Sequence, residues 1–468
     1  MSMLHEAVDM VSSLQPTRVS GSVVTIRGLT IHARHLPLSV GSTVALEAGP
    51  DGHDTSIRNG EVIGFNGHDH IIMLYDALDG IQPGARVHGS HTAGRFASLG
   101  KGLLGRVVDG LGRPIDGRGP IAMDARRPLI GEGVEPLARA PLNQPLPTGI
   151  RVIDSMTTIG RGQRMGIFSR PGVGKSTLLG AMARHASSDI NVIALIGERG
   201  REVQEFIQDT LGPEGLARSV VVVATSDESP LLRVRASLLA TAIAEYFRDL
   251  NGGQNVLLAM DSLTRFAQAQ RQVGLASGEQ PAMRGYPPSV FAMLPILVER
   301  AGAVDGGGSI TGLYTVLVES DDMAEPVSDA AQSVLDGHIV LCPDRAARGQ
   351  YPAVDCLQSI SRVAERVSDE NHRAARIEVR SLLAALGDVE ELLSIGAYAK
   401  GSDPVTDTAI ELRERLEAFF IQSADASTSY PETCRDLVQL ATDAIRLRKR
   451  MTSTAAQTPK IQTNGTTS

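Results

Sequence analysis

The chain has 468 residues and a formal net charge of -8, from 45 basic and 53 acidic side chains. This acidic balance argues against a nucleic-acid partner, because a protein that binds a phosphate backbone needs an excess of basic groups. No apolar run reaches transmembrane length, and the polar start of the chain lacks the basic segment of a signal peptide. The three cysteines lie far apart and in no metal-ligand spacing, which predicts reduced thiols, so we expect a cytoplasmic protein. The length of the chain predicts two or three domains.

Residues 1–17 are predicted to form an amphipathic helix, since apolar side chains recur there at helical spacing. Residues 18–91 have the pattern of short strands separated by Gly, Asp and Asn turns, for example at 22–26, 61–65 and 70–74. That pattern predicts a small closed β-barrel. The helix could either pack on this barrel or serve as a docking segment, and the sequence leaves both open.

From residue 92 to 365 strands alternate with helices, which predicts a doubly wound α/β domain. Within it, the run from Gly166 to Thr177 changes from a buried strand to a glycine-rich turn and then to a helix. Such a turn points backbone N–H groups at phosphate oxygens, and the helix adds its positive N-terminal end. We therefore predict a phosphate-binding loop that binds ATP. Its residues are Arg170, Pro171, Gly172, Val173, Gly174, Lys175, Ser176 and Thr177.

Two side chains of this loop have predicted roles in ATP hydrolysis. Lys175 would reach the β and γ phosphates, and the Ser176 hydroxyl would bind Mg²⁺. Ser169 replaces the first glycine of the usual motif, so on the motif alone an incidental glycine-rich turn stays open. Gly172 and Gly174 keep the backbone freedom that the loop requires.

Two further apolar runs lead to a carboxylate. Residues 191–196 lead to Glu198, and residues 255–260 lead to Asp261. The carboxyl ends of parallel strands share one edge of a sheet, where ligands bind, so we expect both acids near the phosphate-binding loop. Asp261 would hold Mg²⁺ through its water shell, and Glu198 would orient the attacking water. Either acid alone could instead be a helix N-cap, but three such elements in β-α-β order favour catalysis.

Beyond residue 366 the helical period predominates, which predicts a helical C-terminal domain over residues 366–450. Its predicted helices are residues 374–386, 388–393, 407–421 and 431–446. Residues 451–468 are rich in Thr, Ser, Gln and Asn and are predicted to be disordered. The expected architecture is therefore an N-terminal β-barrel, a central RecA-like doubly wound P-loop ATPase domain and a C-terminal helical domain.

Several longer motifs resemble those of one family, the type III secretion ATPases. The matching runs are Gly160–Arg164, Gly197–Glu202, Met260–Phe266, Gly285–Phe291, Glu319–Pro326, Leu335–Val340 and Gly396–Asp403. These enzymes are the cytoplasmic ATPases of flagellar and injectisome export, and they are related to the catalytic subunit of rotary ATP synthases. The resemblance covers nearly the whole chain and is weakest over residues 1–90 and in the tail.

The resemblance adds three residues to the predicted site. It implies that Arg362 is an arginine finger that reaches the neighbouring subunit's nucleotide, where its planar cation suits the charge of a γ-phosphoryl group in transit. It also implies that the Tyr351 ring packs on the adenine, and we expect Arg199 to support its loop by pairing with an acid. From the residues alone, Arg362 would be a surface ion-pair partner and Tyr351 a core residue.

A chain that supplies Glu198 to its own site and Arg362 to the next must close into a ring, and the resemblance implies a homohexamer. It further implies Mg²⁺-dependent ATP hydrolysis that releases cargo from chaperones for an export gate at the inner membrane. A stalk protein would be a further partner, and a cytoplasmic regulator would dock on residues 1–17. Flagellar export is the expectation; an injectisome ATPase, a rotary ATP synthase subunit and a hexameric RNA translocase are the alternatives.

Overall fold

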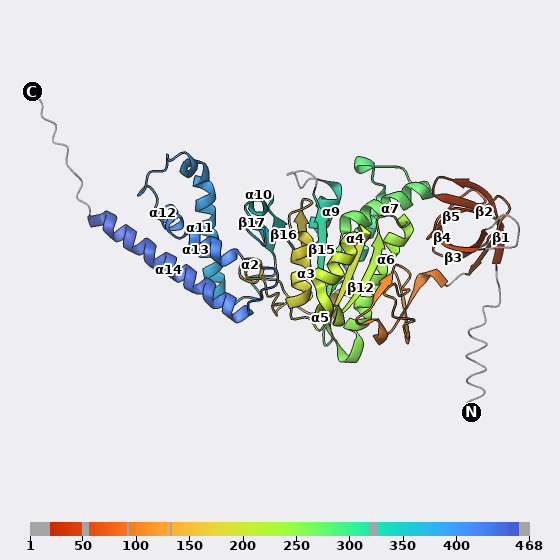
Figure 1. Ribbon diagram of the computed structural model, residues 1–468, viewed down its shortest axis with the longest axis horizontal. Coiled ribbons are helices and arrows are strands. Elements are labelled where there is room, and N and C mark those ends of the chain that lie inside the picture. Colours follow the sequence, from red (N-terminus) through yellow and green to blue (C-terminus); the bar gives the residue numbers. More distant parts are fainter. Residues whose placement is uncertain (1–18, 49–55, 91–92, 132, 319–324, 458–468) are drawn as a thin grey trace, which may run out of the picture. The chain divides into compact units, whose positions relative to one another are not determined.

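The computed structural model (Figure 1) describes residues 19–48, 56–90, 93–131, 133–318 and 325–457. By their contacts these residues form two compact units. The first unit contains the residues up to 140 together with 188–335, and the second contains 141–187 together with the residues from 336 onward. The predicted helix at 1–17 lies outside the described residues.

The N-terminal part of the first unit is a closed β-barrel, as predicted. Its described strands are β1 Val19–Arg27, β2 Thr30–Arg34, β3 Thr43–Ala48, β4 Ser56–Asn66, β5 Asp69–Leu74 and β6 Arg86–Ser90. Around the barrel they follow the order β1-β2-β5-β4-β3-β6. Side chains alternate between interior and surface in β3, where every second residue is buried. Buried aliphatic residues such as Ile31, Leu46 and Val87 fill the interior.

The rest of the first unit is built on a parallel sheet. Its strands are β8 Val107–Asp109, β11 Ile190–Glu198, β12 Ser219–Thr225, β13 Asn255–Asp261 and β15 Ser309–Leu317. Within the unit they follow the order β15-β13-β11-β12-β8, and the short β14 (Gly302–Ala303) pairs antiparallel with β15. β11 is buried without interruption from Ile190 to Gly197, the pattern of a parallel strand that is covered on both faces.

Helices cover this sheet. The helix α6 (Pro230–Arg248) packs on β11 and β13, and the Ser229 hydroxyl caps its N-terminus. The other helices of the unit are α4 Gly200–Glu205, α5 Gly212–Ala217, α7 Leu263–Ser277, α8 Pro288–Val298 and α9 Pro326–Val334. Short helical turns connect these elements, namely η1 Ala93–Arg95, η2 Lys101–Leu103, η3 Pro136–Ala138, η4 Phe206–Leu211, η5 Leu250–Gly252 and η6 Met283–Gly285. A separate two-stranded sheet is formed by β7 (Phe96–Leu99) and β9 (Ala125–Pro128).

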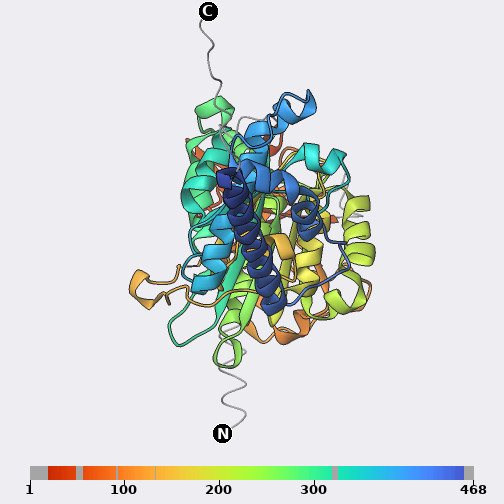
Figure 2. The ribbon, with the colours of Figure 1, turned by 90° about the vertical axis from the view of Figure 1, so that its left-hand side faces the viewer.

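The second unit carries the remaining described strands and the C-terminal helices. β10 (Arg164–Ser169) pairs in parallel with β16 (Gly337–Leu341), and β17 (Val354–Ser361) pairs antiparallel with β16. The helices are α2 Arg151–Met156, α3 Lys175–His185, α10 Pro343–Ala347, α11 Glu370–Ser394, α12 Pro404–Glu411, α13 Arg413–Phe420 and α14 Tyr430–Gln457. The helix α14, dark blue in Figure 2, packs against α11 and α12. None of the described helices combines the length and the apolar content needed to cross a membrane.

The predicted fold class is confirmed, but three predictions about the C-terminal helices were wrong. α11 is continuous through Gly387, because it is capped by Asp369 and packs along α14. The predicted helix at 407–421 is divided at Leu412, whose buried side chain turns into the core. α14 continues beyond residue 450 to Gln457, since alanines favour helix there and no proline comes before Pro459. Residues 458–468 lie outside the described part of the chain.

Candidate active site

The predicted phosphate-binding loop lies in the second unit, between β10 and α3. β10 ends at the buried Ser169, and α3 begins at Lys175. Gly172 and Gly174 have positive φ angles of 80° and 91°, a conformation that is costly for other residues. Gly174 stands at the N-cap of α3 and supplies no capping side chain, so the start of the helix offers its N–H groups to an anion.

Tyr351 lies beside this loop. A Cβ atom added to Gly174 would stand 3.2 Å from Cε1 of the Tyr351 ring, so the ring borders the loop. The Tyr351 residue is 44% exposed, which contradicts the alternative of a core tyrosine. Its carbonyl oxygen accepts a hydrogen bond from the Gln422 N–H at 2.9 Å. An exposed aromatic ring at the edge of such a loop suits stacking on a base.

Arg362 directly follows β17 in the second unit. Its backbone N–H donates to the Asp336 carbonyl at 3.0 Å. Its side chain is exposed, and within the described part of the chain it has no ion-pair partner, whereas the Arg164 guanidinium binds the Asp336 carboxylate at 2.9 Å. A permanently charged guanidinium that is exposed in this way can contact a second molecule.

Glu198 and Asp261 lie in the first unit, at the ends of neighbouring strands. They are the last residues of β11 and β13, which pair in parallel with Leu195 opposite Asp261. The structure thus brings both acids to the same edge of the sheet. A positive φ of 72° at Gly197 and a register shift between Ile196 and Glu198 turn the chain at this edge.

Neither acid is a helix N-cap. Ser262 caps α7, through a hydrogen bond from Arg265 N to its hydroxyl at 3.2 Å, and Arg199 occupies the N-cap of α4. Asp261 is 2% exposed and accepts a hydrogen bond from Thr315 Oγ1 at 2.7 Å. This bond orients the buried carboxylate, and the capping alternative is wrong for both residues.

Arg199 pairs with Glu202, one turn further along α4, at 3.6 Å. Its side chain is 82% exposed, so this ion pair contributes little to stability. A role of Arg199 in supporting the loop stays a prediction.

The available donor groups suit a Mg²⁺ ion that arrives with a nucleotide. Among the described residues, no cluster of three His, Cys, Asp or Glu side chains could hold a metal by itself. The Ser176 hydroxyl and the Asp261 carboxylate are hard oxygen donors, and Mg²⁺ in nucleotide sites commonly takes only one or two protein ligands beside phosphates and water.

Two polar residues next to these sites were missed in the sequence. Thr315 supports Asp261, and in the sequence it is only one of several hydroxyl residues of β15. Gln422 follows α13, is 6% exposed and contacts Tyr351. No local pattern could have identified Gln422, because its partners Gly149, Arg151 and Tyr351 lie far away in the sequence.

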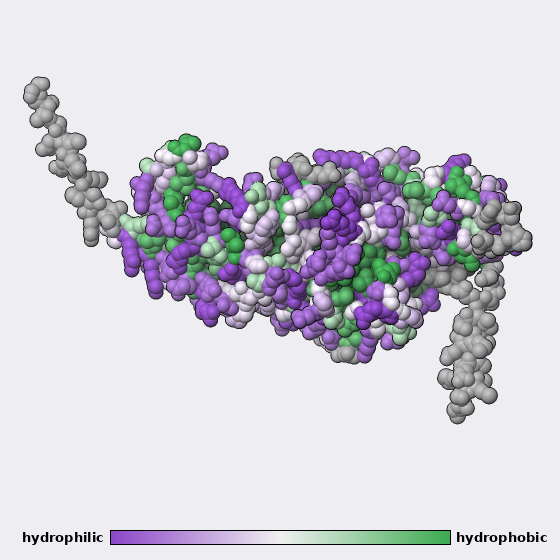
Figure 3. Space-filling model, viewed as in Figure 1, coloured by the Kyte–Doolittle hydropathy of each residue, from purple (hydrophilic) through white to green (hydrophobic). Residues whose placement is uncertain are grey.

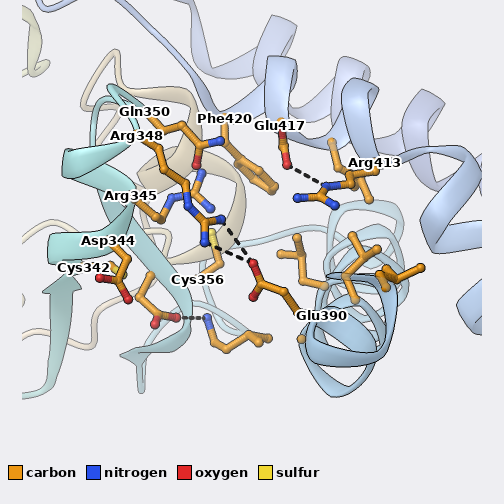
Figure 4. Close-up of a pocket in the computed structure, with 17 residues that line it drawn as sticks. Cys342, Asp344, Arg345, Arg348, Gln350, Cys356, Glu390, Arg413, Glu417 and Phe420 are labelled. Carbon is orange, nitrogen blue, oxygen red and sulfur yellow. Dashed lines mark hydrogen bonds and ion pairs between the residues drawn. The ribbon is translucent and has the colours of Figure 1, made fainter. Parts of the chain in front are cut away.

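A cavity of about 270 Å³ lies in the second unit, between α10 and the helices α11 and α13 (Figure 4). Gln350, the residue before Tyr351, lines it together with Phe420. An ion pair of 3.2 Å joins Arg348 to Glu390 across the cavity. Its charged lining residues are Asp344, Arg345, Arg348, Asp355, Glu390, Arg413 and Glu417. The cavity therefore separates α10 and the residues up to Gln350 from these helices.

Comparison with known proteins gives the class of enzyme. Residues 149–361 match the ATP synthase alpha/beta family, nucleotide-binding domain, and this range contains both the phosphate-binding loop and the two acids. Residues 368–439 match the T3SS EscN ATPase C-terminal domain. The chain is therefore a P-loop ATPase with the nucleotide-binding domain of the ATP synthases.

Relatives that match nearly the full length of the chain identify its family within this class. The chain is 49% identical over 417 residues to the flagellum-specific ATP synthase of Salmonella typhimurium, with 87% of this chain and 91% of the relative covered. It is 46% identical over 435 residues to the type 3 secretion system ATPase of Xanthomonas euvesicatoria, with 92% and 96% covered. The assembled ATPase EscN of enteropathogenic E. coli has a TM-score of 0.82 and 43% identity, with 90% of this chain and 100% of EscN covered. The protein belongs to the type III secretion ATPase family.

Proposed function

We propose that this ATPase works with Mg²⁺ in a homo-oligomeric ring and energises type III protein export during flagellar assembly. One observation carries the proposal. The glycine-rich loop before α3 and the two acids at strand ends all lie within residues 149–361, which match the nucleotide-binding domain of the ATP synthase alpha/beta family. The flagellar assignment is supported by relatives such as the flagellum-specific ATP synthase of S. typhimurium. Export by an injectisome is the second candidate, supported by the X. euvesicatoria ATPase.

Each side chain of the site has a proposed task. Lys175 neutralises charge on the β and γ phosphates, while the backbone N–H groups of residues 172–177 bind phosphate oxygens. Ser176 and Asp261 hold Mg²⁺, which when bound neutralises charge on the transferred group. Glu198 orients and polarises the attacking water, so that it lies in line with the bond that breaks.

Arg362 is proposed to act between subunits. It is exposed at the end of β17, where a neighbouring nucleotide can reach it. Each subunit would donate Arg362 to one neighbour and receive the arginine of the other, and such head-to-tail contacts close into a ring. EscN is known as an assembled ATPase, which supports a ring here, and we propose a hexamer.

The proposed partners follow from the relatives and from the N-terminal segment. EscN has been solved with its central stalk EscO, in a structure whose TM-score to this chain is 0.81, so we propose a stalk protein for this ring. Residues 1–17 would bind a cytoplasmic regulator, and chaperone–cargo complexes would deliver substrates for an export gate. We propose a cytoplasmic location at the inner-membrane export apparatus. The part of the surface formed by α11 and α14 is hydrophilic with apolar patches between (Figure 3).

The decisive experiment mixes two impaired variants. Glu198→Gln keeps the side-chain shape but loses the charge that polarises water, so it should bind MgATP and hydrolyse it at least about 100-fold more slowly. Arg362→Ala should also bind MgATP and turn over roughly a thousandfold more slowly. In the mixture some interfaces combine an intact Glu198 with an intact Arg362, so we expect partial recovery of turnover.

Arg366→Ala is the matched control, because Arg366 is exposed in the same segment and should not affect turnover. Normal turnover of Arg362→Ala would refute the shared site. A rotary ATP synthase subunit would need a second kind of chain for hydrolysis, and an RNA translocase would be stimulated by RNA. The net charge of -8 leads us to expect no nucleic-acid partner.

A further inference from the structure

Gln422 connects three segments of the second unit and is 6% exposed. Its side-chain oxygen accepts a hydrogen bond from the Arg151 N–H at 2.8 Å. Its side-chain amide donates to the carbonyl oxygens of Gly149 and Ala426, both at 2.8 Å. Its backbone N–H donates to the Tyr351 carbonyl at 2.9 Å. The hydrogen bonds of one buried residue therefore join a turn before α2, the loop before α14 and the tyrosine beside the phosphate-binding loop.

The turn at residues 149–151 is a firm anchor for Gln422. Gly149 has a φ of 77°, and a Cβ added there would stand 2.5 Å from Ser427 Oγ and 2.8 Å from His185 Cβ, so the turn is closely packed. Arg151 also donates from Nη2 to the Ile421 carbonyl at 2.7 Å. Residues 421–422 are therefore fixed from the side of this turn.

The chain before Tyr351 is not closely packed, whereas Ala353 and Val354 after it are buried where β17 begins. The preceding α10 is a helix of 5 residues, and the cavity of about 270 Å³ separates it from α11 and α13 (Figure 4). Tyr351 itself is 44% exposed. Because the chain before Tyr351 is loosely packed, the position of the ring is set by the buried start of β17 on one side and by the hydrogen bond that Gln422 donates to the Tyr351 carbonyl.

We propose that Gln422 is a positioning residue for the nucleotide base. Its side chain fixes the end of α13 to the turn at 149–151, and its backbone N–H then holds Tyr351 beside the phosphate-binding loop. The inference rests on the proposed function, in which Tyr351 packs on the base. It follows that recognition of the base depends on Gln422, whereas binding of the phosphates by Lys175 and its loop does not.

The test compares MgATP with Mg-tripolyphosphate, a probe that has the phosphates but no base, by calorimetric titration of the full chain. Gln422→Met keeps the length of the side chain and removes its hydrogen bonds. We expect the Kd for MgATP to rise about five- to tenfold, the worth of one or two hydrogen bonds. The Kd for tripolyphosphate should stay within about twofold, and kcat within about threefold, so that the effect on turnover appears in KM.

Two further variants show whether Gln422 acts through Tyr351. Tyr351→Ala should weaken MgATP binding by a similar factor, and adding Gln422→Met to it should weaken binding no further. If Gln422→Met does not fold, Gln422→Glu takes its place. It keeps the acceptor for Arg151 N–H and loses both donated bonds, so it should weaken MgATP binding more than tripolyphosphate binding.

Gln163→Met is the matched control. Gln163 is also fully buried, and it bonds to Gly160, Asp336 and Ser361 but not to the Tyr351 segment. Its loss should lower the melting temperature without changing the ratio of the two affinities.

Equal weakening of both ligands by Gln422→Met would overturn the inference, because a general disturbance of the fold acts on both. Unchanged MgATP affinity, or full additivity with Tyr351→Ala, would overturn it as well. An unmutated chain that binds neither ligand would refute the nucleotide site itself, which separates failure of the proposed function from failure of this inference.

Discussion

The phosphate-binding loop contains two glycines with similar backbone conformations and different surroundings. Gly172 has a φ of 80°, and an added Cβ atom would meet nothing within 4 Å. Gly174 has a φ of 91°, and an added Cβ atom would stand 3.2 Å from Cε1 and 3.4 Å from Cδ1 of Tyr351. Alanine substitutions at the two positions therefore separate backbone strain from contact with the ring.

Gly172→Ala should weaken MgATP binding through backbone strain alone. Alanine in the left-handed region costs about 1–2 kcal/mol, which corresponds to roughly 5- to 30-fold in Kd if the loop must keep this conformation. Gly174→Ala carries the same strain and also requires the ring to move by a few tenths of an ångström. Because Tyr351 is 44% exposed the ring can move, and what is lost is its contact with the base, about 1 kcal/mol or roughly a further fivefold.

Titration with MgATP and with Mg-tripolyphosphate measures the two contributions. Gly174→Ala should bind MgATP about fivefold more weakly than Gly172→Ala, while the two variants bind tripolyphosphate equally. In a Tyr351→Ala background the difference for MgATP should vanish. Equal MgATP affinities of the two variants, or a difference that persists without the ring, would refute the reasoning.

Changes elsewhere test the loop lysine, the N-terminal segment and one buried acid. Lys175→Ala should abolish turnover and weaken nucleotide binding; near-normal turnover and affinity would exclude this site. Deletion of residues 1–14 should keep basal ATPase activity and lose the regulator in a pull-down, and full binding by the truncated chain would contradict the docking role. Burial raises the pKa of Asp154 from 3.8 to about 7, although hydrogen bonds from Thr148 and Gly149 lower it in part. Between these pH values the folded chain keeps a proton that the unfolded chain releases, so the free energy of unfolding should fall as the pH rises, by at most about 4 kcal/mol. Denaturant titrations at several pH values should show a shallower fall for Asp154→Asn, and an unchanged slope would contradict this.

Local periodicity was sufficient to predict the barrel and the sheet, because the order of apolar and polar residues within a strand reflects which of its residues are buried. β3 alternates residue by residue, and β11 is buried throughout up to its last residue, so both patterns are visible in the sequence. The helix boundaries were less predictable. A glycine inside a helix costs about 1 kcal/mol relative to alanine, and contacts of α11 with α14 offset this cost at Gly387, which a local reading cannot anticipate.

The residues of the site were predictable where they belong to short contiguous motifs. The glycine-rich loop is contiguous, and Glu198 and Asp261 stand at the ends of apolar runs, so strand pairing alone brings the acids to one edge. Thr315 and Gln422 were not predictable, because each acts on a distant segment. Thr315 is 54 residues from Asp261, and Gln422 is 271 residues from Arg151. Supporting residues of this kind are visible only once the chain is folded.

One strand links the two residues that are proposed to serve different subunits. Tyr351 comes shortly before β17, and Arg362 follows its last residue, Ser361. The ends of β17, Val354 and Ser361, pair with Leu341 and Gly337 of β16, so they stand only roughly 13 Å apart, and the register shifts between these two pairs. Tyr351 and Arg362 thus flank the two ends of one short strand. Gln422 holds the Tyr351 end, and the Asp336 carbonyl holds the Arg362 end by a hydrogen bond of 3.0 Å. Under the proposed roles, a base that shifts Tyr351 acts on the same strand that presents the finger to the next subunit, which gives a ring a direct way to couple occupancy of one site to hydrolysis in the next.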